Sequence, residues 1–220
     1  MSLDPPTRLD PPLAGWTVGL LRVDGGRSAL ARALARTGSQ VLALPTLSLR
    51  AVPDAGQARA ELESLGHAAA WIFVSPAAVR FAWRAWPEFA LSSAARVFAV
   101  GPGTAKSLAR RGVPAIYPRQ RHDSEGLLAL VELGDIAGTV ALVKAPGGRA
   151  LLADGLRKRG LRVREVAVYH RGPARWDRRH RARLDALLRA PPRALLLATS
   201  GEALTALAKL AGSHLDAVLR

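Results

Sequence analysis

The sequence predicts an α/β protein built on parallel β-sheets, with two doubly wound domains joined by a two-stranded connector. One observation is a run of aromatic and β-branched residues at 71–74, typical of a buried strand. The run leads directly into Ser75, which suits a helix N-cap, and Pro76, which suits the first helical position. The same order of strand, small-residue turn and helix returns at 97–100 and 101–104, as expected for parallel α/β sheets.

A second observation concerns domain organisation. Two segments, 46–52 and 162–171, alternate between apolar and polar residues, so each predicts a strand with one solvent-exposed face. Because they flank a central α/β segment, we expect them to form the connector between two domains. The expected layout is a flexible N-terminal arm (1–15), a discontinuous first α/β domain (16–45 and 174–220), two connector strands (46–53 and 162–173) and a second α/β domain (54–161).

The N-terminal region predicts a strand, a helix and a strand in succession. The first strand covers 16–21 and ends at Arg22. Ser28 can cap the helix that follows, and Gly38 can end it in the left-handed conformation that glycine adopts easily. The second strand covers 41–44.

The rest of the chain continues the alternation of helices and strands. The expected elements are a helix at 57–65, helices after the turns at 75 and 101, a strand at 115–117, a helix capped by Ser124, a strand at 139–143, a helix ending at Gly160, a basic helix at 176–188, a strand at 194–198 and a final helix. The segment FVSPAAV around residue 75 resembles LATSGEAL around residue 200. A partner for the GPGT turn would then fall beyond Arg220. We therefore expect either a truncated chain or a C-terminal domain that is incomplete by a strand and a helix.

Composition restricts the class of protein. The chain has 220 residues, 49% hydrophobic and 22% charged, as in ordinary globular proteins. It has no cysteine, which excludes disulfides and thiolate metal sites. No apolar run approaches the roughly 20 residues of a membrane span. The N-terminus lacks the apolar core of a signal peptide, so we expect a cytoplasmic protein without a membrane partner.

The formal net charge is +15, from 32 Lys and Arg against 17 Asp and Glu. Two explanations are open. One is the bias toward Arg and Ala in high-GC genomes. The other is a polyanionic partner, either nucleic acid or a small molecule with several carboxylates or phosphates.

The common catalytic and cofactor motifs do not occur. The turn GPGTAK at 101–106 lacks the third glycine of a dinucleotide fingerprint and the Gly-Lys pair of a Walker A loop. Ser200 lacks the first glycine of a nucleophile elbow. The five histidines have no metal-ligand spacing. We therefore expect neither a metal nor a cofactor.

Small-residue turns at the carboxyl ends of strands are the remaining candidates. They are Ser75, Gly101–Thr104, His122–Ser124, Gly147–Arg149 and Thr199–Gly201. Each of them alone suits ordinary helix capping. At the facing edges of two domains, their helix N-termini would bind an anion at many points through free backbone N–H groups.

These segments together resemble the uroporphyrinogen-III synthase family in order and spacing, from Trp16 to about Leu210. The matching pieces are SPAAV at 75–79, VGPGTAKSLARRG from Val100, DSEGLLAL from Asp123, APGGRALLADGLRKRG from Ala145, VREVAVYHR from Val163 and LATSGEAL from Leu197. The resemblance implies two α/β domains joined by a two-stranded ladder. Family members continue at the C-terminus through a further strand, a GPxTA-like turn and a helix.

The resemblance also implies a cyclising lyase of tetrapyrrole and haem biosynthesis, acting as a monomer without a cofactor. Its substrate would be hydroxymethylbilane, a linear chain of four pyrroles with eight carboxylates. Loss of the hydroxyl group as water and inversion of the terminal ring would give uroporphyrinogen III. Because the substrate closes spontaneously to the uninverted isomer, the enzyme's main task would be to hold the chain folded.

The resemblance implies roles for individual residues. Tyr169, the tyrosine of VYHR, would be catalytic as a hydrogen-bond donor or general acid to the departing hydroxyl. A purely structural role for this strand tyrosine is the alternative. Thr104 would cap its helix. The expected substrate-binding residues are Arg22, Ser75, Pro76, Ala77, Gly101, Thr104, Ser124, Gly147, Gly148, Thr199, Ser200 and Gly201.

Two other functions fit the same sequence. One is nucleic-acid binding through the arginines at 175–189, which would give an affinity that falls steeply with salt. The arginines are dispersed and no recognition motif is present, so we expect no nucleic-acid partner. The other is a bilobed binding or regulatory protein without turnover, because fold does not determine function.

Overall fold

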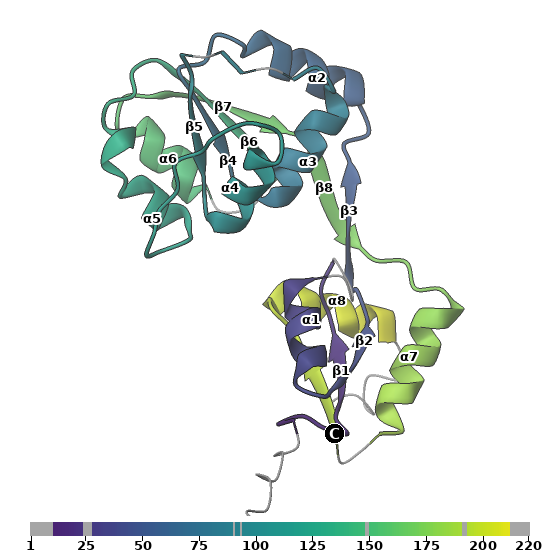
Figure 1. The fold of residues 1–220 in the computed structure, drawn as a ribbon. Helices are drawn as coiled ribbons and strands as arrows, with labels where there is room; N and C mark the ends of the chain where they lie inside the picture. Colours follow the sequence, from purple (N-terminus) through teal and green to yellow (C-terminus); the bar gives the residue numbers. More distant parts are fainter. Residues whose placement is uncertain are drawn as a thin grey trace, which may run out of the picture. The chain divides into compact units, whose positions relative to one another are not determined.

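The computed structural model describes residues 11–23, 28–89, 91–92, 94–147, 150–190 and 193–211. The chain divides into two compact units, which Figure 1 shows. The small unit contains the residues up to Ser48 and those from Gly172 onward, and the large unit is Leu49–Arg171. Most of the predicted N-terminal arm, 1–10, lies outside the described residues.

Three parallel strands form the sheet of the small unit, in the order β2-β1-β9. The elements of this unit are β1 (Thr17–Leu20), α1 (Ala29–Arg36), β2 (Gln40–Ala43), α7 (Arg178–Leu188), β9 (Ala194–Leu197) and α8 (Gly201–Ala211). A Cβ on Gly19 would lie 2.6 Å from Cδ2 of Leu187. The glycine in β1 therefore lets α7 approach the sheet closely.

The predicted ends of α1 are confirmed. Ser28 is its N-cap, and the Ser28 Oγ accepts a hydrogen bond from the Ala31 N–H at 3.0 Å. Gly38 follows the helix with φ +86°, the left-handed conformation that side chains disfavour. The surroundings are tight as well, because a Cβ on Gly38 would lie 2.9 Å from Cβ of Pro11.

Four parallel strands form the sheet of the large unit, in the order β5-β4-β6-β7. The elements of this unit are α2 (Ala55–Ser64), β4 (Ala70–Phe73), α3 (Pro76–Ala85), β5 (Arg96–Ala99), α4 (Pro102–Ala109), α5 (Ser124–Leu128), the 3₁₀ helix η2 (Val131–Leu133), β6 (Thr139–Lys144), α6 (Leu151–Arg157) and β7 (Arg162–Ala167). The chain passes from β4 to β5 and then returns to the other side of β4 at β6. The strand order thus reverses between β4 and β6, the position where α/β proteins commonly bind ligands.

Two hydrophobic cores lie on opposite faces of this sheet. Trp71 and Phe73 of β4 belong to the core that includes residues of α2, α3 and α4. Ile72, between them in sequence, belongs to the core that includes residues of α5 and α6. Helices therefore cover both faces (Figure 1), and the predicted α/β class with parallel sheets is confirmed.

The predicted connector is wrong in part. β3 (Leu47–Ala51) does form a two-stranded sheet with β8 (Tyr169–Pro173). The range 162–173 is not one connector strand, however, because its first six residues are β7 and pair with β6. This pairing ends where the Val168 N–H donates to the Lys144 carbonyl at 3.1 Å, and the chain then changes partner. The alternating sequence of β7 reflects an edge strand rather than a connector strand.

The predicted strand at 115–117 is also wrong. This segment forms an isolated bridge between Ile116 and Phe98. The Ile116 N–H donates to the Val97 carbonyl at 2.8 Å, and the Ile116 carbonyl accepts from the Ala99 N–H at 2.9 Å. Pro114 and Pro118 flank the bridge and have no N–H to donate, so the pairing cannot extend.

The sequence led us to expect that a strand and a helix are missing at the C-terminal end of the small unit. β9 is the last of the described strands along the chain, and it lies at one side of the described sheet. Residues 212–220 lie outside the described part of the chain. The expected incompleteness therefore stays a prediction.

Candidate active site

Four of the five predicted turns belong to the large unit. Three of them follow strands of one parallel sheet, and the turn at His122–Ser124 follows the segment that forms the isolated bridge at Ile116. The turn at Ser75 follows β4, the turn at Gly101 follows β5, and the turn at Gly147 follows β6. Two close approaches bring the first turns together. A Cβ on Gly103 would lie 3.8 Å from Cγ of Pro76, and a Cβ on Gly101 would lie 3.1 Å from Cβ of His122.

The Ser75 turn has the predicted geometry. Ser75 is the N-cap of α3 with extended backbone, and Pro76 is the first helical residue. The Ser75 Oγ accepts a hydrogen bond from the Ala78 N–H at 3.0 Å. Pro76 is exposed, while Ser75 and Ala77 are half-buried. The helix N-terminus therefore opens toward solvent at the strand ends.

Tyr169, the first residue of β8, contacts this turn. Its hydroxyl oxygen lies 3.1 Å from the Ser75 Oγ, and either oxygen can be the donor. The tyrosine ring stacks on Phe81 of α3, with 5.5 Å between ring centroids and 13° between planes. Tyr169 is only 1% exposed. The structure thus joins the predicted catalytic residue to a predicted binding residue, but it buries the tyrosine.

The GPGT turn differs from expectation in its cap. The N-cap of α4 is Gly101, which has no side chain to cap the helix. Thr104 lies inside the first turn of α4, is 4% exposed, and donates its backbone N–H to the Gly101 carbonyl at 3.0 Å. The prediction that Thr104 caps the helix is therefore wrong, because its position inside the helix buries its side chain.

The prediction that Ser124 is a cap is wrong by one residue. Asp123 is the N-cap of α5, and its Oδ1 accepts from the Gly126 N–H at 2.8 Å. Its other carboxylate oxygen pairs with the Arg121 Nε at 2.5 Å. The hydrogen bond from Arg121, followed by the one from the Gly126 N–H, lowers the pKa of the Asp123 carboxyl below its usual value. Ser124 is the first residue of the helix.

Gly126 makes this loop possible. A Cβ at this position would lie 1.9 Å from the carbonyl oxygen of Arg121, a distance that no real side chain tolerates. The missing side chain lets the loop before α5 fold back onto the helix. This contact fixes Arg121 beside Asp123, and through His122 it positions the loop against Gly101.

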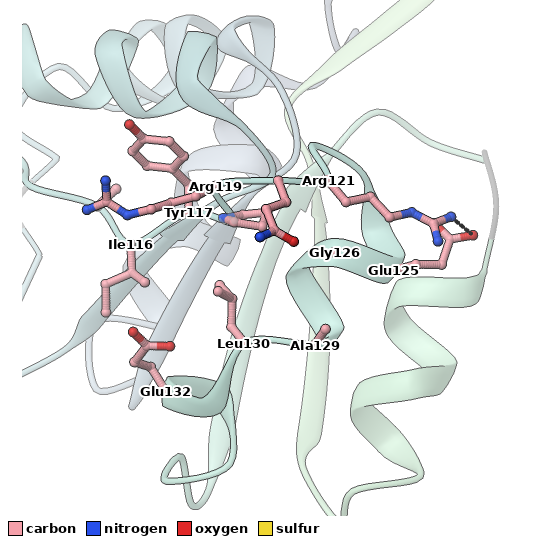
Figure 2. Close-up of a pocket in the computed structure, with 12 residues that line it drawn as sticks. Ile116, Tyr117, Arg119, Arg121, Glu125, Gly126, Ala129, Leu130 and Glu132 are labelled. Carbon is pink, nitrogen blue, oxygen red and sulfur yellow. Dashed lines mark ion pairs between the residues drawn. The ribbon is translucent and has the colours of Figure 1, made fainter.

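A pocket of about 730 Å³ adjoins this loop, between the 115–121 segment and α5 with η2. Figure 2 shows the Arg121–Glu125 ion pair on one side of the pocket and the side chains of Tyr117 and Arg119 on the other. The Arg121 Nη2 lies 3.5 Å from the Glu125 Oε1. Sequence reasoning missed this pocket, although the run YPRQRH offered a signal: two arginines and a histidine within four positions.

The end of β6 carries a charged network that was also missed. Glu165 of β7 accepts hydrogen bonds from the Lys144 Nζ and the Arg157 Nη2, each at 2.8 Å. The hydrogen bond from Lys144 is the largest of the effects that lower the pKa of the Glu165 carboxyl. Beyond Lys144, Gly147 is exposed with φ +70°. Gly148 and Arg149 of the predicted turn lie outside the described residues.

The other predicted site residues belong to the small unit. Arg22 follows β1 and is half-buried. Thr199, Ser200 and Gly201 follow β9 and are exposed at the start of α8. The Ser200 Oγ accepts a hydrogen bond from the Ala203 N–H at 3.2 Å. Ser200 therefore caps α8 in the way that Ser75 caps α3, as the similarity of the two sequence segments suggested.

Two general properties complete the description. Within the part of the chain that the structure describes, no helix combines the length and apolar character needed to cross a membrane. Among those same residues, His, Asp and Glu side chains nowhere form a group of three that could hold a metal ion.

Comparisons with known proteins agree with the resemblance of the motifs. The family model described as uroporphyrinogen-III synthase HemD matches residues 28–219. The uroporphyrinogen-III synthase of Escherichia coli is 36% identical over 126 residues, which are 53% of this chain and 49% of that protein. The enzyme of Salmonella typhimurium is 41% identical over 96 residues, 43% of this chain and 37% of that protein. These matched regions span about half or less of the curated relatives.

Solved structures share the fold. A mutant uroporphyrinogen III synthase from the extreme thermophile Thermus thermophilus aligns with a TM-score of 0.60 and 23% identity, covering 88% of this chain and 76% of that chain. The enzyme from Helicobacter pylori aligns with a TM-score of 0.53 and 15% identity, covering 88% of this chain and 78% of that chain. At these identities the likeness shows a common α/β fold. The family model, which matches most of the sequence, shows more: the chain belongs to the uroporphyrinogen-III synthase family.

Proposed function

We propose that this protein converts hydroxymethylbilane to uroporphyrinogen III, with loss of water and inversion of the terminal pyrrole ring. The observation that supports this most directly is the close approach of the turns at Ser75, Gly101 and His122 beside one sheet edge of a family member. Such an edge suits a substrate with eight carboxylates, because helix N-termini favour negative charge.

The backbone supplies the binding groups in this proposal. N–H groups in the first turn of a helix precede the first intrahelical bond, so those of Ala77 in α3 and Gly103 in α4 are suited to carboxylates. Both residues have small side chains or none, which lets a ligand approach the backbone. The net charge of +15 attracts the polyanionic substrate over longer distances.

The catalytic contribution in this proposal is mainly geometric. The open-chain substrate can close through either of two carbons, and holding its ends in one arrangement favours the inverting closure. The pair of hydroxyl groups on Ser75 and Tyr169 supplies a polar group that can assist departure of the substrate hydroxyl. The protein would act as a cyclising hydro-lyase and, as we expect, as a monomer.

A direct experiment tests this function. Hydroxymethylbilane is generated in situ from porphobilinogen with purified hydroxymethylbilane synthase, in the presence or absence of this protein. The products are oxidised, and the uroporphyrin isomers are separated by reversed-phase chromatography. We expect isomer III to predominate with the protein and isomer I without it. Formation of isomer I alone, with protein shown to be folded by circular dichroism, would refute the proposal.

A further inference from the structure

The hydroxyl groups of Ser75 and Tyr169 differ sharply in their access to a ligand. Tyr169 is 1% exposed, and its ring packs on Phe81 within the core of the large unit. Ser75 is half-buried at the carboxyl end of β4, directly before the exposed Pro76. A substrate at the strand ends therefore reaches the serine oxygen before it reaches the tyrosine oxygen.

Hydrogen-bond geometry limits how the two groups can share their protons. A serine hydroxyl has one proton to donate and two lone pairs that accept. One lone pair of the Ser75 Oγ is used by the Ala78 N–H at 3.0 Å. If the Tyr169 hydroxyl, 3.1 Å away, donates to the second lone pair, the Ser75 proton is free to point toward the strand ends. Both acceptor sites of the serine are then occupied, so Ser75 can act on a ligand only as a donor.

We propose that Ser75 is the catalytic residue that contacts the departing hydroxyl of the substrate, and that Tyr169 is a positioning residue that acts through Ser75. This inference rests on the proposed cyclase function. It reverses the roles that the sequence suggested, in which Tyr169 was the donor and Ser75 bound substrate. The reversal follows from burial and from the hydrogen bond that joins the two side chains.

Departure of the substrate hydroxyl and ring closure together balance in protons. The carbon–oxygen bond of the substrate hydroxymethyl group breaks, its electron pair stays on the oxygen, and the Ser75 proton converts the leaving group to water. The Tyr169 proton moves to the Ser75 Oγ in the same relay. When the cyclised product regains its aromatic ring it releases one proton from carbon, and this proton restores the pair through Ser75. No oxidant, reductant or further reactant is required.

Substitutions at both positions test the relay by steady-state kinetics of isomer III formation. Ser75→Gly removes the hydroxyl and retains most capping strength, and we expect kcat to fall about 100-fold with little change in KM. Ser75→Thr keeps a hydroxyl and should retain kcat to within about threefold. Tyr169→Phe removes the proton that replaces the one Ser75 gives up, so kcat should fall by about 10-fold to 100-fold, but no further than in Ser75→Gly. The double variant should be no slower than Ser75→Gly alone.

A matched control separates capping from catalysis. Asp54 is the N-cap of α2 in the same unit, and its Oδ1 accepts from the Gln57 N–H at 2.7 Å. Asp54→Gly should lower the melting temperature about as much as Ser75→Gly does and leave kcat unchanged. If Ser75→Gly fails to fold, Ser75→Asn carries the same comparison, because it keeps a capping oxygen and lacks the hydroxyl.

The outcomes distinguish this inference from the function on which it rests. If wild-type protein forms no isomer III, the proposed function itself fails. If wild type is active and Tyr169→Phe is slower than Ser75→Gly, or if the losses multiply in the double variant, Tyr169 contacts the substrate independently. Either of these last results overturns the proposal that Tyr169 acts through Ser75 and leaves the proposed cyclase function in place. Full activity of Ser75→Gly also overturns it.

Discussion

Gly126 offers a sharp test of the loop that precedes α5. In a Gly126→Ala variant the new Cβ would lie 1.9 Å from the carbonyl oxygen of Arg121 and 2.8 Å from its carbonyl carbon. Both of these atoms belong to the backbone, so rotation of a side chain cannot relieve the contact. The loop must move away by about 1.5 Å to reach ordinary van der Waals separation.

The magnitude follows from three contributions. Forcing a methyl group into a packed site costs about 3 kcal/mol when backbone must shift. Displacing the loop weakens the hydrogen bond from the Gly126 N–H to Asp123, a capping interaction of about 1 kcal/mol. Alanine recovers about 1 kcal/mol through its higher helix propensity. We therefore expect a loss of about 3 kcal/mol in the free energy of unfolding of the large unit.

Urea denaturation monitored by tryptophan fluorescence measures this loss, because Trp71, Trp83 and Trp86 all belong to the large unit. Gly103→Ala is the matched control. Its Cβ would have its nearest neighbour at 3.8 Å, so we expect unchanged or slightly higher stability. A Gly126→Ala midpoint equal to that of Gly103→Ala would refute the close contact between Arg121 and α5.

Three further substitutions probe other parts of the molecule. The ring of Phe89 has its centroid within 5.1 Å of the ring centroids of Trp71, Trp83 and Trp86. Phe89→Ala should therefore destabilise the large unit by about 3–5 kcal/mol in urea denaturation. A loss below about 1 kcal/mol would contradict the core position of Phe89. Gly38 has φ +86°, and a Cβ at this position would lie 2.9 Å from the Pro11 Cβ. Gly38→Ala should therefore lower the melting temperature of the small unit in calorimetry. An unchanged melting temperature would contradict the left-handed turn. The carboxyl of Glu165 has a lowered pKa, so its pairing stabilises the fold above the unfolded pKa near 4.5 and is lost as pH falls through the folded pKa. Glu165→Gln should therefore reduce the stability difference between about pH 7 and about pH 3, and an unchanged difference would contradict the network.

Local sequence signals predicted much of the large unit. The structure has the predicted buried strand at the apolar run 71–74 and the predicted helix start at Ser75 and Pro76. It also has the predicted helix after the glycine turn at 101. The close packing of those turns followed from the parallel strands. The hydrogen bond between Ser75 and Tyr169 could not be predicted, because it joins residues 94 positions apart and depends on where β8 begins.

The wrong predictions share a cause. Alternation at 162–171 was interpreted as one strand, but period alone does not reveal that a strand changes partner at Val168. Ser124 and Thr104 are good capping residues by type, yet the cap positions belong to Asp123, one residue before Ser124, and to Gly101, three residues before Thr104. Residue preference identifies a helix start only to within a few residues, and tertiary contacts select the residue that performs the role.

The proline-flanked bridge at Ile116 has a consequence for self-association. An outer strand such as β5 would normally present a row of backbone donors and acceptors to which another chain could add. Here Ile116 occupies the Val97 carbonyl and the Ala99 N–H, and Pro114 and Pro118 offer no donors of their own. The segment protects the sheet against intermolecular strand addition without becoming a strand itself.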